Sequence, residues 1–495
     1  MSEDSSNKRY PVKGFFSRNI GWILGGFLLL CFLAAFAYSA VMLNYKIAII
    51  YVMIPFAVIF LMISFYNYKI FAFFIFIYSY LFCNFSILQP WFKTGVGFDF
   101  LLYIFISILL LDTIFVKRKI NWSYSRTPAL LLSVIWFIYT LLLLFNPVSR
   151  STQAWFTSVR WTSVYMLLII LFVPIVLEGK KEIRIFFNAL AVLTILGALT
   201  AIRQKIFGFN RFEWTWLYAG DHYRTHIINT GIRYFSFFTD AANFGTSMGL
   251  SFVVFAILGF SEVKTVKKIF YFVTMVLSFI GFLLSGTRSA IAIIIVGIAT
   301  FVIIVKNSKY IISLGSVMIA GVLLLMFTNV GNGNQYIRRM RTAFDSEDAS
   351  FQVRVMHHAE MRKYMKGHLF GVGIGLAGGK ALRYVPDSSL AQIPTDSWLY
   401  SLWIETGIVG LSLYLLIMLA IIFYGAYCSF FRLKDKVLRR YNNIAVSVLA
   451  GILVTSYANE VLAQFPNGII VFICISIIFI TVRLDKEQEQ EKIIT

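Results

Sequence analysis

Two carboxylates, Asp396 and Glu405, lie where a polar segment of the sequence, 330–396, gives way to an apolar one. Asp396 stands at the expected start of a helix in IPTDSWLYSLWIETGIVG, and Glu405 follows nine residues later on nearly the same helical face. Asp396 and its neighbours Thr395 and Ser397 are residue types that cap helices. A carboxylate at a helix mouth can also take a proton from an attacking hydroxyl group. We therefore interpret Asp396 as a catalytic base or helix cap, and Glu405 as a substrate-binding acid or the buried partner of an arginine.

Arginine side chains offer the complementary chemistry, because a guanidinium group holds phosphate through paired N–H donors. Arg288 in SGTRSA connects two long apolar runs and is expected at membrane depth, where an unpaired charge is costly. We interpret Arg288 as catalytic, with an interfacial anchor as the alternative. Arg233 likewise lies at the start of an apolar run, in GIRYFSFFTDAANFG, and is expected to bind substrate. Asp240 follows it, either as a substrate-binding acid or as the salt-bridge partner of Arg233.

Further arginines are concentrated in the same polar segments, and Arg211 and Arg354 are candidates for binding a phosphorylated ligand. The other interpretation of this group is pairing with anionic headgroups or with nearby acids such as Asp348. One cluster resembles a headgroup-facing surface, and its members are Arg338, Arg339 and Arg341.

The elements that must position these residues are membrane helices. The 495 residues are 59% hydrophobic and only 14% charged, with a mean hydropathy of +0.78. A membrane-spanning helix needs roughly 20 apolar residues, and fourteen such segments can be placed between 21–42 and 468–482. The first lacks a small-residue cleavage site, so we expect it to be retained. Their continuous apolar character excludes alternating barrel strands. The sequence therefore predicts an all-α, polytopic protein with about 12–14 transmembrane helices.

The net charge of +21 is explained by membrane topology rather than by nucleic acid. With both termini in the cytoplasm, the short basic connections all face inward, as the positive-inside rule requires. These connections are 117–126, 179–184, 261–268, 306–309 and 428–443. We expect a single membrane domain, 1–495, in a plasma membrane, with extracytoplasmic loops at about 204–236 and 330–396 and no nucleic-acid partner. Arginine is preferred over lysine on the outward side, which indicates a phosphorylated ligand there.

Several other motifs indicate structure rather than chemistry. Residues 349–366 read as an amphipathic helix after the cap-forming run DSEDAS. GVGIG at 371–375 imitates a nucleotide-binding loop, but no strand precedes it. We therefore expect a tight turn, with N–H groups that are available to an anion. The five histidines form no convincing metal set, although His222 and His226 are four residues apart. We expect neither a metal nor a cofactor.

The segment from about 230 to 410 resembles the bacterial O-antigen ligase and O-antigen polymerase superfamily. The matching elements are Arg354 at the start of a helix, LFGVGIG from Leu369 to Gly375, and TDSWLYSLWIETGIVG from Thr395 to Gly410. SGTRSA and RYFSFFTDAANFG are similar to the family's arginine-containing stretches before membrane spans. The resemblance implies a GT-C-like glycosyltransferase architecture with two large extracytoplasmic loops.

The resemblance also implies an activity. Members are metal-independent, inverting glycosyltransferases whose donors are oligosaccharides on undecaprenyl pyrophosphate, at the outer face of the bacterial plasma (inner) membrane. Arg288, helped by Arg233 or Arg354, would then neutralise the departing pyrophosphate. Besides membrane lipids, such an enzyme would have a chain-length regulator and a flippase of the same pathway as partners.

One departure from the family pattern separates two activities. Counting back nine residues from Glu405, the position where ligases carry histidine is Asp396, and their asparagine position is Ser397. The missing histidine favours a polymerase that joins repeat units over a ligase that transfers glycan to a lipid A core. A flippase or exporter of the same lipids would also need outward arginines. It would however show repeat symmetry and charges on both sides of the midplane, whereas the charges here gather at the outer ends of the predicted helices.

Overall fold

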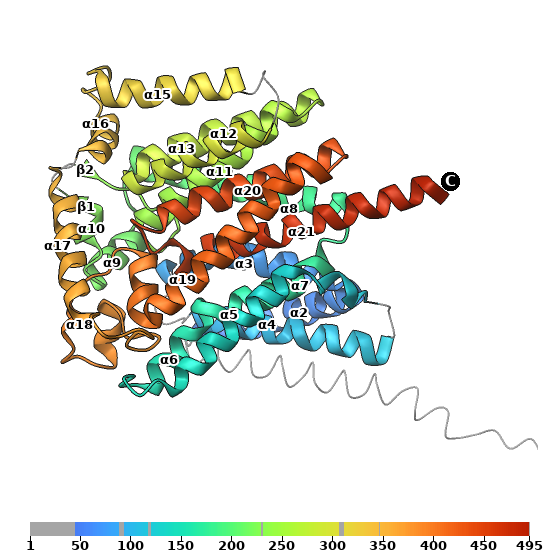
Figure 1. Ribbon diagram of the computed structural model, residues 1–495, viewed down its shortest axis with the longest axis horizontal. Coiled ribbons are helices and arrows are strands. Elements are labelled where there is room, and N and C mark those ends of the chain that lie inside the picture. The colour runs from blue at the N-terminus through green and yellow to red at the C-terminus, as the bar shows by residue number, and fades with distance from the viewer. Residues whose placement is uncertain are drawn as a thin grey trace, which may run out of the picture. The chain divides into compact units, whose positions relative to one another are not determined.

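The computed structural model describes residues 45–88, 94–116, 120–228, 231–305, 311–345 and 347–494. The predicted first span, 21–42, and the loop 306–309 lie outside these residues. The described chain is almost entirely helical (Figure 1), and its single sheet pairs β1 (Ile227–Ile228) with β2 (Gly231–Ile232) in antiparallel register, Ile227 opposite Ile232.

Nine helices of the described residues are long and apolar enough to cross a membrane. They are α4 (Thr94–Leu111), α5 (Pro128–Leu142), α6 (Thr152–Val159) continued by α7 (Tyr165–Val176), α8 (Lys180–Phe207), α11 (Ala241–Ser261), α12 (Thr265–Ser285), α19 (Trp398–Tyr427), α20 (Lys436–Thr455) and α21 (Asn467–Ile494). Four shorter apolar helices lie in α2 (Tyr45–Tyr66), α3 (Tyr68–Leu88), α13 (Ile291–Ile304) and α15 (Ser316–Phe327). The prediction of an all-α, polytopic membrane protein is confirmed.

The chain forms two compact units. The smaller contains residues 1–71 and 105–116, and the described part of it includes α2 and the C-terminal end of α4. Within it, Phe71 and Phe105 stack with nearly parallel rings, 6.3 Å between centroids. The larger unit contains residues 72–104 and 117–495, and everything below concerns this unit.

Two helices form the core of the larger unit. The apolar stretches of α21 and α11 are 94% and 83% buried, far more than those of their neighbours. α11 packs on α12 and α13, while α21 packs on α7 and α20. Because small residues let backbones approach, Gly249 and Gly297 lie at these contacts, where an added Cβ would meet Ala290 or Val253. A rigid bundle therefore carries the loops at its end.

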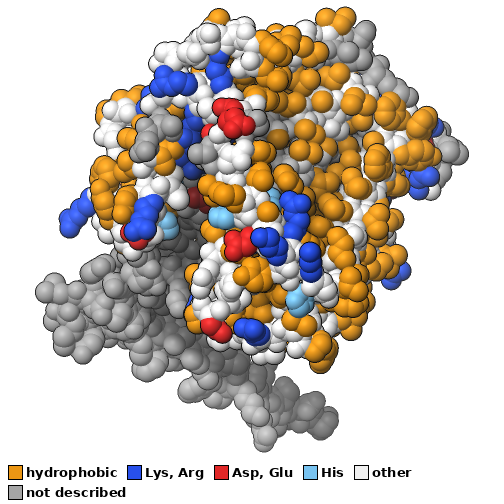
Figure 2. All heavy atoms as spheres, turned by 60° about the vertical axis from the view of Figure 1, so that its left-hand side comes forward, with side chains coloured by type: hydrophobic (Ala, Val, Ile, Leu, Met, Phe, Trp, Pro, Cys, Tyr) orange, Lys and Arg blue, Asp and Glu red, His pale blue; other side chains and the backbone are white. Residues whose placement is uncertain are grey.

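Both predicted loops lie at the same end of this unit, opposite the C-terminal end of α21 (Figure 1). The first contributes α9 (Arg211–Ala219), α10 (Tyr223–His226) and the hairpin. The second contributes α16 (Gln335–Arg341), α17 (Ala349–Tyr364) and α18 (Ser389–Gln392). The helix expected over 349–366 is α17. Figure 2 turns this end toward the viewer and shows charged side chains gathered beside a broad hydrophobic surface.

A backbone contact between two glycine segments holds the second loop against α19. Gly407 interrupts α19 with a positive φ of 72°, and Gly371 in the turn has a φ of 75°. An added Cβ on either glycine would lie within 2.6 Å of the other segment's backbone. The N–H groups of Val372 and Gly373 donate to the carbonyls of Ile404 and Glu405. The predicted tight turn is present, and these two N–H groups are used by protein rather than by an anion.

Candidate functional site

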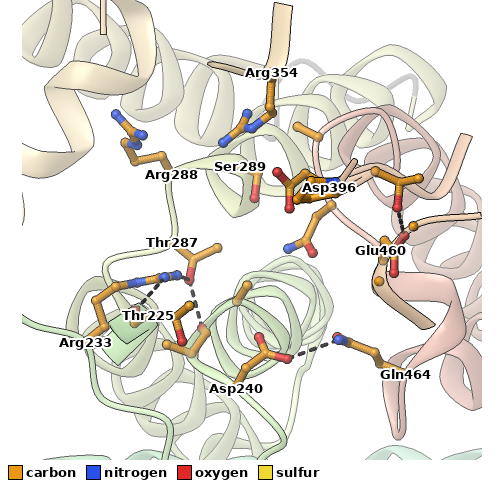
Figure 3. Close-up of a pocket in the computed structure, with 18 of the residues that line it drawn as sticks. Thr225, Arg233, Asp240, Thr287, Arg288, Ser289, Arg354, Asp396, Glu460 and Gln464 are labelled. Carbon is orange, nitrogen blue, oxygen red and sulfur yellow. Dashed lines mark hydrogen bonds between the residues drawn. The ribbon is translucent and has the colours of Figure 1, made fainter. Parts of the chain in front are cut away.

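A cavity of about 710 Å³ opens between the two loops and the ends of α11 and α20 (Figure 3). Its lining contains five of the residues predicted from sequence, and they are Arg233, Asp240, Arg288, Arg354 and Asp396. These residues are up to 163 positions apart in the chain, so only the packed fold brings them together.

Four arginines, which we name the arginine wall, line this cavity: Arg233, Arg288, Arg339 and Arg354. Arg233 follows the hairpin, and its guanidinium donates to the carbonyls of Thr225 and Ser285 and to the hydroxyl of Thr287. All three acceptors are neutral. Burial lowers the pKa of Arg233, with the nearby charge of Arg288 adding to the effect and Asp240 opposing it.

Arg288 begins a short 3₁₀ turn, η5 (Arg288–Ala290), between α12 and α13, so it lies where the loop meets the bundle. Its Nη1 donates to the Thr342 hydroxyl at 2.8 Å and lies 2.5 Å from a carboxylate oxygen of Asp348. Arg354, in the second turn of α17, also lines the cavity and lies between Arg288 and Asp396 in Figure 3. Arg288 thus lies in the short connection between two apolar helices, as its sequence context indicated, and its side chain lines the cavity.

Arg339 corrects the interpretation of one cluster. Arg338 and Arg341 donate to the backbone carbonyls of Asn332 and Val330, but the Nε of Arg339 donates to the carbonyl of Gly286 at 2.6 Å and lines the cavity. On a helix, neighbouring residues project about 100° apart, so one member of the cluster faces inward. Burial, with smaller effects from the charges of Arg233 and Arg288, lowers the pKa of Arg339 to about 10, and Asp348 opposes this shift.

Asp396 lies in the wall opposite Arg233 as a carboxylate exposed to the cavity. The cap of α19 is Ser397, whose hydroxyl accepts from the N–H of Tyr400, so Asp396 is released from the capping role that sequence had left open. Asp396 has a positive φ of 48°, a conformation that Asp tolerates better than most residues. No hydrogen bond to its carboxylate occurs among the described residues. Its proton-accepting oxygens therefore remain available.

A second carboxylate, Glu460, lies beside Asp396, and we name the pair the carboxylate wall. Glu460 belongs to the connection between α20 and α21, and it accepts hydrogen bonds from Thr395 and Ser401. These bonds tie the backbone next to Asp396 to a carboxylate on a different element. They fix the turn that carries Asp396.

Lys380 is a cation of this wall that the sequence analysis missed. Its Nζ lies 2.7 Å from Glu405, which is 2% exposed and is not itself part of the cavity lining. Burial disfavours the charged form of Lys380 and by itself would lower its pKa. The negative charges of Glu405 and Glu460 have the larger effect, so the pKa of Lys380 is raised. The expected arginine partner of Glu405 is thus a lysine, and Glu405 reaches the cavity only through Lys380.

Asp240 caps α11 at the opposite end of the view. One oxygen accepts from the N–H of Asn243 at 2.8 Å, and the other accepts from the side chain of Gln464 at 3.0 Å. Arg233 and Asp240, both described residues, form no ion pair. The salt-bridge interpretation is therefore wrong, and Asp240 with Gln464 presents a polar surface suited to sugar hydroxyls.

His226 also lines the cavity, although its two ring nitrogens are both used. Nδ1 lies 2.7 Å from the carbonyl of His222, and Nε2 accepts from the N–H of Ala241. Burial lowers the pKa of His226 to about 4, so the ring is neutral at pH 7. His226 joins the hairpin to the start of α11 and holds Arg233 in place.

The last predicted site residue, Arg211, is exposed at the start of α9 and is not part of the cavity lining. Sequence reasoning also missed Arg339, Lys380, Glu460 and Gln464. For Lys380 and Glu460 the only sequence signal was a charged residue next to a glycine run or an apolar segment, which many surface residues share.

A second cavity, of about 410 Å³, adjoins the first and shares Arg288 and Arg354 with it. Its remaining lining is largely apolar, from α13, α17 and the end of α20: Ile291, Ile295, Val296, Phe351, Val355 and Val454. The two cavities together suit a molecule with an anionic group at the arginines and a hydrocarbon part along α13.

Comparison with known protein families finds a similarity in one part of the chain. Residues 273–415 match the O-antigen ligase family, and this range contains Arg288, Arg354, Asp396 and Glu405. No curated protein matches the chain. The resemblance to the O-antigen ligase and polymerase superfamily is confirmed, and it supports a glycan-transferring, multi-pass membrane enzyme.

Proposed function

We propose that the chain is a polysaccharide polymerase that transfers a growing glycan from undecaprenyl pyrophosphate to a lipid-linked repeat unit at the outer face of the bacterial inner membrane. The glycan would be an O-antigen, a capsule or an exopolysaccharide. The observation that carries this proposal is that Arg233, Arg288 and Asp396 line one cavity, and that part of its lining lies in the segment matching the O-antigen ligase family.

The arrangement supports an inverting displacement without a metal. The hydroxyl oxygen of the acceptor sugar attacks the anomeric carbon, the bond from that carbon to the pyrophosphate breaks, and Asp396 takes the hydroxyl proton. Arg233, Arg288 and Arg354 bind the departing pyrophosphate and neutralise the negative charge that develops on it. Attack from the side opposite the leaving group inverts the anomeric centre, which suits a base and cations on opposing walls.

The adjoining apolar cavity supports a lipid-linked donor. An isoprenoid chain needs apolar surface that begins where the pyrophosphate is held, and Arg288 and Arg354 border both cavities. Asp240 and Gln464 would hold sugar hydroxyls at the other end of the polar cavity. This division places the lipid toward α13 and the sugars toward α11.

The residue at position 396 favours a polymerase. Ligases of this family carry histidine there, and this chain carries aspartate. The second candidate is an O-antigen ligase, because the matching family bears that description.

Reconstitution in liposomes tests both candidates. The protein is supplied with a repeat unit on undecaprenyl pyrophosphate, with and without a lipid A core acceptor, and products are separated by size. We expect a ladder of lengthening lipid-linked glycans without the core acceptor. Single transfer to the core alone would favour the ligase. Translocation of the lipid with no new glycosidic bond would contradict both and favour a flippase. Arg288→Gln should lose the ladder, whereas the matched control Arg211→Gln should keep it.

A further inference from the structure

The strongest unexplained contact in the cavity is the ion pair between Arg288 and Asp348, which puts an acid on an arginine that should hold an anion. We propose that Asp348 competes with pyrophosphate for Arg288 and thereby speeds release of the undecaprenyl pyrophosphate product. This inference rests on the proposed function, because it compares how the proposed lipid-linked donor and the undecaprenyl pyrophosphate product bind to Arg288.

The pair is close and mostly enclosed. Asp348 Oδ2 lies 2.5 Å from Arg288 Nη1, and the two side chains are only 18% and 14% exposed. Thr342 accepts from the same Nη1. A guanidinium has five N–H donors, so these contacts at one nitrogen leave donors for a phosphate. A phosphate bound there lies next to the carboxylate of Asp348.

The position of Asp348 is fixed by a second role. Its Oδ1 accepts from the N–H of Phe351 at 3.2 Å, and its carbonyl accepts from the N–H groups of Phe351 and Gln352, so Asp348 caps α17. Capping with one oxygen holds the other on Arg288. Arg354 lies on the same helix. The start of α17 therefore brings to the site both a carboxylate that repels a phosphate, Asp348, and a guanidinium that attracts it, Arg354.

Arg233 shows that an acid is not needed to keep an arginine of this wall in place. Its guanidinium is held by three neutral oxygens. Neutral acceptors orient a guanidinium without reducing its attraction for an anion. At Arg288, by contrast, a carboxylate lowers that attraction.

The repulsion falls unequally on donor and product. In the donor the pyrophosphate is esterified at both ends, whereas in the product its terminal phosphate is free and carries more negative charge. Asp348 therefore weakens product binding more than donor binding, which is a form of discrimination by repulsion. Release of product, frequently the slow step of an enzyme, becomes faster.

The test measures binding of undecaprenyl pyrophosphate to the full-length protein in nanodiscs. In Asp348→Asn the side chain keeps its shape and its capping oxygen but loses its charge. We expect this variant to bind undecaprenyl pyrophosphate about tenfold more tightly than the wild type, the order expected for one like charge in a partly buried site. In elongation assays its KM for donor should fall less than its product inhibition constant, and its kcat should decrease.

The control is Glu347→Gln, which removes the same charge from an exposed neighbour. It should bind like the wild type, and equal tightening in this control would overturn the proposal. If Asp348→Asn does not fold, Asp348→Ser provides a second uncharged cap. A purely structural role for Asp348 predicts weaker binding in both variants and would also overturn it.

Failure of the inference can be separated from failure of the proposed function. If the wild type binds undecaprenyl pyrophosphate and Arg288→Gln weakens that binding, but Asp348→Asn leaves it unchanged, only the competition is wrong. If the wild type does not bind this lipid, both are wrong.

Discussion

Arg233 on the arginine wall and Asp396 on the carboxylate wall differ in how their side chains are held. Arg233 donates only to neutral oxygens, so nothing in direct contact cancels its charge. On the carboxylate wall, Glu460 accepts from two hydroxyl groups, and Glu405 behind it is paired with Lys380. Asp396 alone has no such partner among the described residues.

In the proposed function this difference gives Arg233 and Asp396 different roles. A cation held by neutral groups keeps its attraction for an incoming anion. Arg233 would therefore help to hold a phosphate group, and the exposed carboxylate of Asp396 would accept the proton. The neighbouring carboxylates serve mainly to support the turn that carries Asp396.

Replacement of Asp396 should have the largest effect. Asp396→Asn preserves size but removes the proton acceptor, so we expect transfer to fall by about 10³-fold, within the range for loss of a general base. Binding of undecaprenyl pyrophosphate should be retained or strengthened, because a negative charge is lost. The rate is measured by glycan elongation in liposomes, and binding by titration with the lipid.

The matched control for this variant is Ser397→Ala. Loss of the cap should lower the free energy of unfolding by about 1 kcal/mol while leaving the elongation rate near that of the wild type. A loss of activity in Ser397→Ala as large as in Asp396→Asn would mean that both act through the helix start.

Replacement of Arg288 is expected to come second. Arg288→Gln removes one of several cations, so elongation should fall by about 10²-fold, as for one donor to a developing negative charge. Binding of undecaprenyl pyrophosphate should weaken in parallel. If Arg288→Gln reduced the rate without weakening binding of this lipid, its role would lie in the transition state alone.

The sequence alone predicted only some of the residues on the two walls. Arg233, Arg288, Asp240 and Asp396 were recognisable because charges at the ends of apolar segments are costly unless they have a function. Arg354 was recognisable as an arginine in a polar segment, suited to a phosphorylated ligand. The helix over 349–366 and the glycine turn followed from cap residues and glycine spacing. These signals depend on residues that are close together in the chain, so they can be identified in a single sequence.

The remaining site residues depend on long-range packing. Glu460 joins the cavity because the connection after α20 folds against Thr395 and Ser401. Arg339 turns inward because α16 packs on the end of α12, next to Gly286. Whether Ser397 or Asp396 caps α19 is decided by one left-handed residue. Composition and spacing carry no information on such choices.

A change of pH should affect the arginine wall through His226. Its pKa is lowered to about 4 in the folded protein, mainly by burial, against about 6.5 when unfolded. Below pH 6.5 the unfolded chain therefore binds more protons at His226 than the folded protein does. The contribution of neutral, buried His226 to the free energy of unfolding is complete above pH 6.5 and is lost as pH falls toward 4. A shift of this size corresponds to at most about 3 kcal/mol.

Hydrogen exchange of residues 223–233 measures this effect. After correction for the slower intrinsic exchange of amides at low pH, we expect smaller protection factors at pH 4.5 than at pH 7 in the wild type. The difference should be smaller in His226→Gln, whose amide oxygen can still accept from Ala241. An equal pH difference in the two proteins would assign the effect to other groups.

The carboxylate wall should be weakened next by loss of Lys380. Lys380→Met leaves Glu405 buried without a cation, which should cost roughly 2 kcal/mol, less than for a fully enclosed pair because Lys380 is 39% exposed. Adding Glu405→Gln should restore most of this stability. Thermal unfolding of the two single variants and the double variant measures the coupling, and additive losses would show that the pair is not coupled.

The smallest effect is expected for Arg211, which lies outside both walls. Arg211 is exposed at the start of α9, where a positive charge opposes the helix dipole. Arg211→Gln should therefore leave elongation within about twofold of the wild type and unfolding within about 0.5 kcal/mol, as for most surface substitutions. The comparison with Arg288→Gln is sharp because both variants remove one guanidinium from the loop-bearing end of the protein. If Arg211→Gln also lost elongation, basic charge in the loops as a whole, rather than the four arginines of the cavity, would attract the lipid pyrophosphate.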